Sequence, residues 1–148
     1  MRGIDLMNGG KTIIEMNAAH IMEQDVISCN RESTCHEMAE IMFEHNFGSL
    51  PIVDIENRLI GIVTECDLLS AMIKGMDFRE ATAHEVMTEL VVSIPEEMPA
   101  EEIYGLLQSR HLIRVPVVNR KGKLVGIVAR RDILGSYIES TIPPLPTF

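Results

Sequence analysis

Two aspartates in matching sequence contexts are the residues of this chain best placed for chemistry. Asp67 follows Gly-Ile-Val-Thr-Glu-Cys and Asp132 follows Gly-Ile-Val-Ala-Arg-Arg, each near the expected start of a helix. A carboxylate accepts hydrogen bonds from hydroxyl groups. Phosphate groups need cations or the free backbone N–H groups of a helix N-terminus. Because Arg130 and Arg131 precede Asp132, the second context favours an anionic ligand more than the first, which has Glu65 in place of Arg130.

A structural interpretation competes with this one. Thr64 and Asp67 also fit a capping box, in which the two side chains satisfy the first N–H groups of the helix. This interpretation weakens for Asp132, because Ala129 has no hydroxyl with which to cap. Even so, an acid in the first helical turn gains about 0.3–1 kcal/mol from the helix dipole. Arg130 and Arg131 could equally be solvated surface residues, so both alternatives stay open.

Other reactive residues do not form a recognised catalytic arrangement. The stretch from His36 to Glu40 begins like a zinc-protease motif but has Glu40 where histidine is required. His111 could help to hold phosphate or could be an ordinary surface histidine. The three cysteines are odd in number and include no CxxC pair, which favours a reduced, cytoplasmic protein. We therefore expect a protein that is not an enzyme and needs no metal.

The elements that position these residues occur twice. Residues 18–73 and 83–138 match at 15 of 56 positions without an insertion, at a constant offset of 65. Each copy predicts a short strand, a helix, two strands joined by a turn, and a second helix. In the first copy these are a strand at Val26 and Ile27, a helix capped by Ser33 or Thr34, strands over 50–54 and 59–63, and a helix over 65–73. Val91 and Val92 form the corresponding first strand of the second copy.

The sequence therefore predicts an α/β protein of two β-α-β-β-α repeats. A repeat of 56 residues buries too little surface to be secure alone, so we expect the two to pack with pseudo-twofold symmetry. Residues 1–17 form an N-terminal extension, residues 74–82 a linker and residues 139–148 a flexible tail. Short apolar runs argue against a membrane span or signal peptide.

Charge is distributed unevenly between the repeats. The net charge of the chain is −9, which argues against nucleic-acid binding. Residues 18–73 carry a net charge of −8, whereas residues 83–138 are neutral. All seven basic residues of the second repeat lie between Arg110 and Arg131. The second repeat thus has a local positive field inside an acidic protein.

These motifs resemble the cystathionine β-synthase (CBS) domain, and the tandem resembles a CBS pair, or Bateman module, over residues 18–138. The resemblance is carried by the Ala-His-Ile-Met and Ala-His-Glu-Val-Met openings, the Pro-Ile-Val-Asp and Pro-Val-Val-Asn strands, and the two glycine-to-aspartate motifs. It implies a module that binds AMP, ADP, ATP or S-adenosylmethionine in clefts between the repeats and regulates another protein. It also implies a flat homodimer formed through the helices after the two motifs, with the apolar residues Leu68, Leu69, Met72, Ile133, Leu134 and Tyr137.

The resemblance also assigns roles to individual residues. Asp67 and Asp132 would bind ribose hydroxyls, Thr64 and Arg114 would contact phosphate, and Val26, Ile27, Val91 and Val92 would line the adenine. Ala129 departs from the family's Ser or Thr. We expect a phosphorylated nucleotide to prefer the Asp132 site, and the Asp67 site to be empty or to hold adenosine or S-adenosylmethionine. The alternatives are a ligand-free structural dimerisation module and an enzyme that turns over the bound nucleotide.

Overall fold

The computed structural model describes residues 15–141, which divide into two compact units. We name each unit by its two long helices. The α2–α3 unit holds α2 (Cys35–His45) and α3 (Glu65–Ile73), and it comprises residues 26–92 and 120–124. The α5–α6 unit holds α5 (Ala100–Ser109) and α6 (Arg130–Thr141), and it comprises residues 15–25, 93–119 and 125–141.

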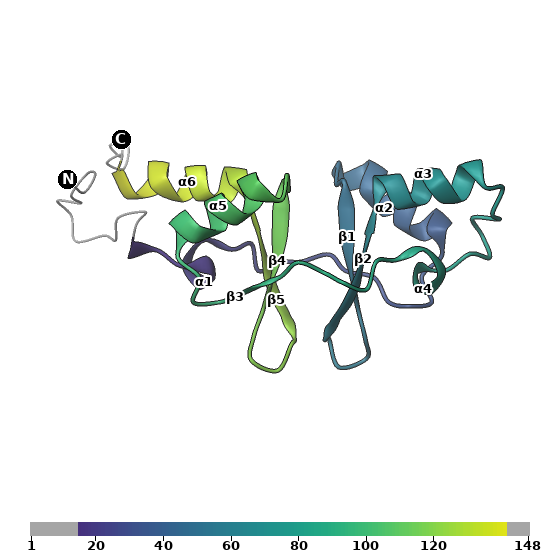
Figure 1. The fold of residues 1–148 in the computed structure, drawn as a ribbon, viewed down its shortest axis with the longest axis horizontal. Coiled ribbons are helices and arrows are strands. Elements are labelled where there is room, and N and C mark those ends of the chain that lie inside the picture. Colours follow the sequence, from purple (N-terminus) through teal and green to yellow (C-terminus); the bar gives the residue numbers. More distant parts are fainter. Residues whose placement is uncertain (1–14, 142–148) are drawn as a thin grey trace, which may run out of the picture. The chain divides into compact units, whose positions relative to one another are not determined.

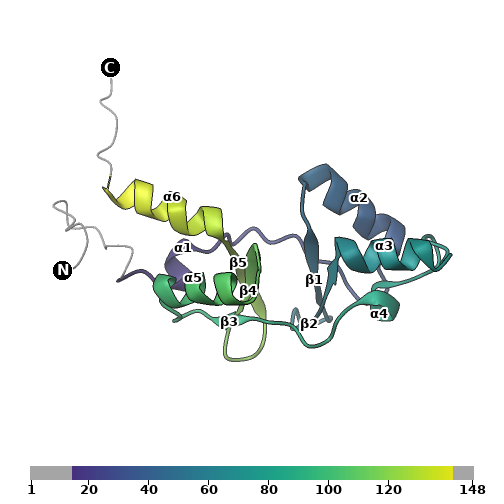
Figure 2. The ribbon, with the colours of Figure 1, turned by 45° about the horizontal axis from the view of Figure 1, so that its top comes forward.

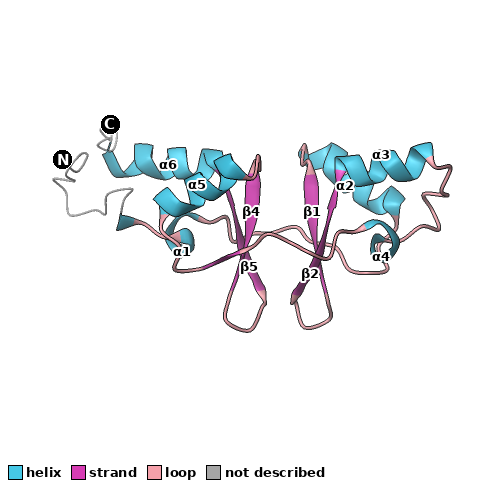
Figure 3. Cartoon of the chain, in the orientation of Figure 1, coloured by secondary structure: helices cyan, strands magenta, loops and turns pink. Residues whose placement is uncertain are grey.

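In the α2–α3 unit, strands β1 (Ser49–Val53) and β2 (Leu59–Thr64) form an antiparallel hairpin. Both helices lie beside this hairpin, and its loop points away from them (Figure 1, Figure 3). The core between them is apolar and fully enclosed, with side chains from both layers: Met38, Leu50, Ile52 and Val63. The predicted helix over residues 65–73 is confirmed. The unit also contains the one-turn helix α4 (Ala83–Val86).

The α5–α6 unit repeats this plan. Its three strands are β3 (Ile94–Pro95), β4 (Arg114–Val118) and β5 (Leu124–Ala129), in the order β3-β4-β5 with β3 parallel to β4. Helices α5 and α6 contact each other, and α1 (Ala18–Ile21) contacts both (Figure 2). The α/β class and the β-α-β-β-α order of this repeat are confirmed. Its core includes Ile94, Ile103, Leu107, Val115, Val117 and Val128.

The two units do not coincide with the two sequence repeats. Helix α1, at the start of the first repeat, belongs to the α5–α6 unit, and helix α4, at the start of the second repeat, belongs to the α2–α3 unit. Glu23, just after α1, exchanges backbone hydrogen bonds of 2.8 and 3.0 Å with Ile127 of β5. Thr88, just after α4, does the same with Ile62 of β2, at 2.9 and 3.0 Å. Thus each glycine-containing strand is completed by backbone from the other repeat.

The two motif glycines make this exchange possible. A Cβ added at Gly61 would lie 2.6 Å from the sulfur of Met87 and 3.2 Å from the Thr88 carbonyl. A Cβ at Gly126 would lie 2.6 Å from Cγ and 2.9 Å from Cβ of Met22. Carbon atoms in contact prefer about 3.5–4.0 Å. Only glycine leaves room for the methionine that opens the other repeat.

The short first strands were predicted at the wrong residues. Val26, Ile27, Val91 and Val92 are half-buried and lie outside any strand. The parallel pairing occurs three residues later, at Ile94 with Val117, and as an isolated bridge between Cys29 and Ile52. The pairing follows burial, because Cys29 and Ile94 are core residues whereas the preceding valines are only half-buried.

Two other boundaries differ from expectation. Helix α2 ends at His45, because Asn46 adopts a left-handed conformation there, rather than at Phe47 and Gly48. Helix α6 extends to Thr141, so residues 139–141 are helical and not part of a tail. The rest of the predicted tail and most of the N-terminal extension lie outside the described residues. The segment over 74–82 is anchored, since the Ala81 carbonyl accepts a hydrogen bond from Cys35 N–H.

Candidate functional site

The Asp67 carboxylate caps helix α3. Its Oδ2 accepts hydrogen bonds from the backbone N–H of Thr64 at 2.8 Å and from the Thr64 hydroxyl at 3.0 Å. In return, the Thr64 hydroxyl accepts from Asp67 N–H at 3.2 Å. This is the complete capping box of the structural interpretation. The geometry gives Asp67 a folding role whether or not a ligand binds.

The Asp132 carboxylate is held by a smaller set of contacts. Its Oδ2 accepts a hydrogen bond of 2.7 Å from the backbone N–H of Ala129. No hydroxyl is present at position 129 to complete a box, as the sequence predicted. The side chain is half-buried at the start of α6. Asp132 therefore occupies the position in α6 that Asp67 occupies in α3, but it accepts fewer hydrogen bonds at the start of its helix.

Three arginines gather near this carboxylate. Arg114 begins β4, and Arg130 and Arg131 begin α6. Burial lowers the pKa of the Arg114 guanidinium from its usual value, and the negative charge of Asp132 opposes that shift. The two chain segments are tied together, because Arg130 N–H donates to the Ile113 carbonyl at 3.2 Å. The predicted charged residues of the second repeat are thus brought to one end of the α5–α6 unit.

A pocket of about 340 Å³ opens beside Arg130 in the same unit. It lies between the end of α5 and the start of α6, and it is lined by Tyr104, Leu107, Gln108, His111, Leu112, Ile113 and Arg130. His111 adopts a left-handed backbone conformation, with φ at 54°. Its equivalent in the first repeat, Asn46, has φ at 57°. Sequence reasoning missed Tyr104 and Gln108, although their spacing of four residues places them on one helical stripe.

The predicted site residues do not all fall in one unit. Arg114, Arg130, Arg131 and Asp132 belong to the α5–α6 unit. The others belong to the α2–α3 unit: Val26, Ile27, Thr64, Asp67, Val91 and Val92. Within that unit, the segment leading to Val91 pairs with β2, the strand that ends at Thr64. The expected adenine lining of the second repeat is therefore associated with the Asp67 motif.

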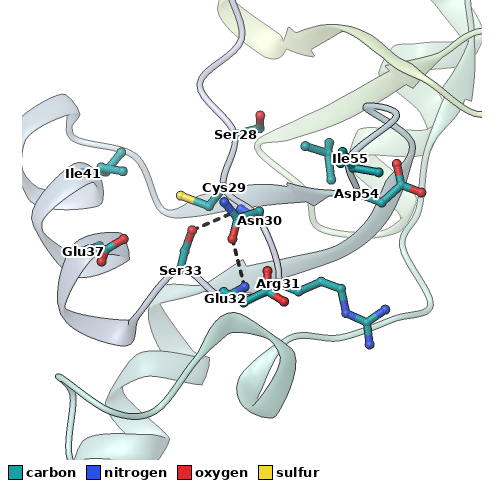
Figure 4. A pocket seen from close by; sticks show the side chains of 11 residues that line it. Ser28, Cys29, Asn30, Arg31, Glu32, Ser33, Glu37, Ile41, Asp54 and Ile55 are labelled. Carbon is teal, nitrogen blue, oxygen red and sulfur yellow. Dashed lines mark hydrogen bonds between the residues drawn. The ribbon is translucent and has the colours of Figure 1, made fainter.

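A second pocket, of about 830 Å³, lies in the α2–α3 unit (Figure 4). None of the ten predicted site residues lines it; its walls come from residues 28–33, α2 and the end of β1. Within its wall, Asn30 N–H donates to the Ser33 hydroxyl at 3.1 Å, and the Asn30 side-chain carbonyl accepts from Glu32 N–H at 2.9 Å. Arg31 extends away from Ser33 and contacts His84 at 3.0 Å. The arrangement supports a well-formed loop and points to no particular ligand.

The Asp54 carboxylate at the edge of this second pocket is also engaged. It accepts from the backbone N–H of Arg58 and of Glu56, each at 2.9 Å, and from Arg58 Nε at 2.8 Å. These bonds, led by the one from the Arg58 backbone, lower the pKa of Asp54. Asp54 thus fixes the hairpin turn.

Residues 15–141 also bear on metal binding, thiol chemistry and membrane crossing. In this part of the chain, no three or more His, Cys, Asp or Glu side chains are grouped to hold a metal ion. Cys29 and Cys35 are buried free thiols, and burial raises the pKa of both; Cys66 is exposed. None of the helices described here has the length and apolarity needed to cross a membrane.

The fold and the duplicated motif define a class, a tandem α/β repeat whose two copies exchange their first turns. The chain belongs to the CBS domain family: the family model matches residues 18–74 and 83–139. The expected tandem CBS pair is therefore confirmed.

Known proteins agree with this assignment. An uncharacterized protein of Methanopyrus kandleri is 34% identical over 130 residues, covering 86% of this chain and 66% of that protein. Of the first curated relatives it matches, the chain spans between 21% and 66% of their length.

Two solved structures are similar over most of the chain. One is Hypoxic Response Protein I with two coordinated zinc ions, known from Mycobacterium tuberculosis, with a TM-score of 0.72 and 30% identity, covering 81% of this chain and 98% of that one. The other is the CBS domain pair of protein MJ0100 in complex with 5′-methylthioadenosine and S-adenosyl-L-methionine, with a TM-score of 0.70 and 29% identity, covering 82% and 95%.

Proposed function

We propose that this CBS pair is a regulatory module that binds an adenosine-containing ligand at the Asp132 motif and passes the signal to a partner protein. The observation that carries the proposal is the gathering of Asp132, Arg114 and Arg130 at one end of the α5–α6 unit, beside a pocket. The ligands of the MJ0100 pair, 5′-methylthioadenosine and S-adenosyl-L-methionine, support the adenosine part.

Each group has a chemical task in this proposal. The Asp132 carboxylate accepts hydrogen bonds from ribose hydroxyls. Arg130 and Arg131, at the N-terminus of α6, attract the phosphate, as does the partly desolvated Arg114. A phosphorylated nucleotide such as AMP, ADP or ATP therefore fits this motif better than an uncharged nucleoside. The Asp67 motif has Glu65 at the place of Arg130 and suits a less anionic ligand.

Binding would regulate by mass action, because a ligand that prefers one conformation raises its population. We propose a cytoplasmic homodimer as the working assembly and another protein as the reader of the signal. We propose no catalytic role, and product analysis after incubation with ATP tests this. Conversion of the nucleotide by the purified chain would establish an enzyme instead.

Calorimetric titration of AMP into wild type and Asp132→Ala tests the site. We expect affinity to fall at least about tenfold in the variant, because a hydrogen bond to a charged group is worth about 1.5–3 kcal/mol. Asp67→Ala is the matched control, since it removes the same carboxylate from the same helical position of the other repeat. Undiminished AMP affinity in Asp132→Ala would contradict the proposal.

A thermal-shift screen separates this function from a structural dimerisation module. A ligand present at about 100 times its Kd should add roughly 2.7 kcal/mol of stability. AMP, ADP, ATP, adenosine and S-adenosylmethionine are the probes. The absence of a shift with every one of them would favour the structural module.

A further inference from the structure

Two turns from different repeats pair with each other inside the α2–α3 unit. One turn joins β1 to β2, and the other, within residues 120–124, leads into β5 and belongs to the same unit. Leu59 N–H donates to the Gly122 carbonyl at 3.0 Å, and Leu124 N–H donates to the Asn57 carbonyl at 2.9 Å. The second repeat therefore contributes one of its turns to the α2–α3 unit.

These two hydrogen bonds flank a pair of cationic residues that lie opposite each other. Arg58 and Lys123 form an antiparallel bridge. A pair flanked in this way exchanges no backbone hydrogen bonds itself, and its Cα atoms approach to about 4.5 Å, the shorter of the two cross-strand spacings. Like charges directly opposite each other destabilise a strand pair. An anion bound between Arg58 and Lys123 would remove this repulsion.

The charges around this pair are positive on one turn and mixed on the other. Residues 120–124 hold three cations and no acidic residue. The turn between β1 and β2 holds one cation and two carboxylates. One of these, Asp54, is engaged within its own turn, because it accepts from Arg58 Nε at 2.8 Å and from two backbone N–H groups. We call the four cations of the two turns the turn cluster: Arg58, Arg120, Lys121 and Lys123.

The turn cluster contrasts with the rest of the unit that carries it. Residues 26–92 contain four basic and twelve acidic residues, a net charge of −8, whereas residues 120–124 contribute +3. Arg58, Arg120 and Lys121 are exposed, and Lys123 is half-buried. Complementary charges steer a partner to one surface, and like charges suppress contact elsewhere. The unit therefore repels an acidic partner over most of its length and attracts it at the turn cluster.

An apolar side chain accompanies these cations and narrows the kind of partner. Ile55, next to Asp54 in the turn between β1 and β2, is 100% exposed (Figure 4). Nucleic-acid binding is typical of chains with a basic balance, whereas this chain has a net charge of −9. Binding to an anionic membrane takes a cluster of four to eight cations beside a membrane anchor. An acidic polypeptide segment with one apolar side chain suits both Ile55 and the cations.

We propose that the turn cluster binds an extended acidic segment of the partner protein, with an apolar side chain of that segment against Ile55. A carboxylate offers about four acceptor positions, so one carboxylate of the segment accepts from both Arg58 and Lys123. The remaining acidic side chains of the segment face Arg120 and Lys121. This inference rests on the partner protein of the proposed function, and it adds the chemistry of that partner and the surface that receives it.

Fluorescence anisotropy with labelled synthetic peptides tests the surface in the full chain. The probe is a short peptide of aspartates and glutamates around a central leucine. One matched peptide replaces every acid by its amide, and a second keeps the acids but has serine in place of leucine. The titrations are made at low ionic strength, because salt screens exposed charges. The acidic leucine peptide should bind and the amide peptide should not; absence of binding by the acidic peptide would overturn the inference.

Charge reversal locates the binding surface. Lys121→Glu and Lys123→Glu should each weaken binding of the acidic leucine peptide about three- to tenfold, because an attraction becomes a repulsion. Lys74→Glu is the matched control, since it makes the same charge change at the end of α3 in the same unit. It should leave the affinity within about twofold. An equal loss in Lys74→Glu would show that only net charge matters, which would overturn the inference.

The apolar contact and the class of partner are tested separately. Ile55→Ser should weaken the leucine peptide about threefold and leave the serine peptide unchanged, because only the leucine loses an apolar contact. An unchanged affinity for the leucine peptide would overturn the contact with Ile55. Phosphatidylserine vesicles and a single-stranded oligonucleotide are the competing probes. If either binds the turn cluster more tightly than the acidic peptide does, the proposed partner is wrong.

Calorimetry with AMP separates failure of this inference from failure of the proposed function. Lys121→Glu should keep the AMP affinity of wild type while it loses peptide binding, because Lys121 lies in a turn away from both aspartate motifs in the sequence. If wild type binds AMP but not the acidic peptide, the docking surface is refuted and the nucleotide proposal stands. If wild type binds the peptide but not AMP, the reverse holds.

Discussion

The α2–α3 unit and the α5–α6 unit are built from the same repeat, and they differ most where their last helix begins. In α3 the carboxylate is held by a backbone N–H and a hydroxyl, and Glu65 follows the capping residue. In α6 the carboxylate is held by a backbone N–H, and two arginines replace Glu65 and Cys66. The duplicated aspartate has thus been kept in both places while its surroundings have diverged.

The same aspartate can therefore serve different roles in the two copies of a duplicated fold. Asp67 completes a capping box with Thr64, and capping alone explains it. Asp132 accepts fewer capping hydrogen bonds than Asp67, and it lies next to arginines that have no part in capping the helix. The Asp132 motif is therefore the better candidate to bind an anionic ligand, although the two motifs are similar in sequence.

The largest expected effect tests what the two units share. Gly126→Ala should lower the free energy of unfolding by about 1–3 kcal/mol, because its Cβ would overlap Met22, close to the methionine main chain. Gly61→Ala should cost less, since Met87 meets it mainly with its flexible end. Urea denaturation measures both.

A double variant shows whether the overlap causes the loss. Met22→Ala creates space beside position 126, so adding it to Gly126→Ala should cost less than the sum of the two single changes. A strictly additive result would mean that the destabilisation has another origin.

The second prediction breaks the cap that distinguishes the units. Thr64→Ala should destabilise the protein by about 0.5–2 kcal/mol, because the hydroxyl that accepts from Asp67 N–H is lost. Denaturant titration followed by circular dichroism measures the change. Serine at this position is the control, and it should recover most of the stability; if it does not, capping is not the reason.

A third prediction rebuilds that cap in the other repeat. Ala129→Thr places a hydroxyl before α6, where Asp132 already accepts from the backbone. We expect the free energy of unfolding to rise by about 0.5–1 kcal/mol. This lies in the lower part of the usual range for a capping residue, because Asp132 already satisfies one N–H group at the start of α6. Loss of stability in the denaturant titration would contradict the equivalence of the two helix starts.

The smallest expected effect concerns the thiols. Cys66→Ser should change the free energy of unfolding by no more than about 0.5 kcal/mol, because the side chain is exposed. The same change should abolish thiol labelling of the native protein. Burial raises the pKa of Cys29 and Cys35, so their reactive thiolates form at higher pH than that of an ordinary cysteine.

Labelling with a chromogenic disulfide reagent at mildly alkaline pH checks this prediction. Wild type should react at Cys66 in the native state and at all three cysteines after unfolding. Rapid labelling of native Cys66→Ser would show that the buried thiols open to solvent.

The sequence alone determined the repeat, the α/β class and the helix over residues 65–73, because these follow from local periodicity and from identities at a constant offset. It also predicted that Ala129 cannot cap. Tertiary structure decided which residues are buried: Leu68 lies in the core, and the parallel pairing occurs at Ile94 and, as a single bridge, at Cys29 rather than at the preceding valines.

Tertiary structure also decided that each glycine strand is completed by the other repeat, with Met22 on Gly126 and Met87 on Gly61. A sequence pattern records which side chains can be buried and where a helix can start. It does not record which of two equivalent strands a segment joins, because both offer the same backbone hydrogen bonds. That choice depends on long-range packing, which exists only in the folded chain.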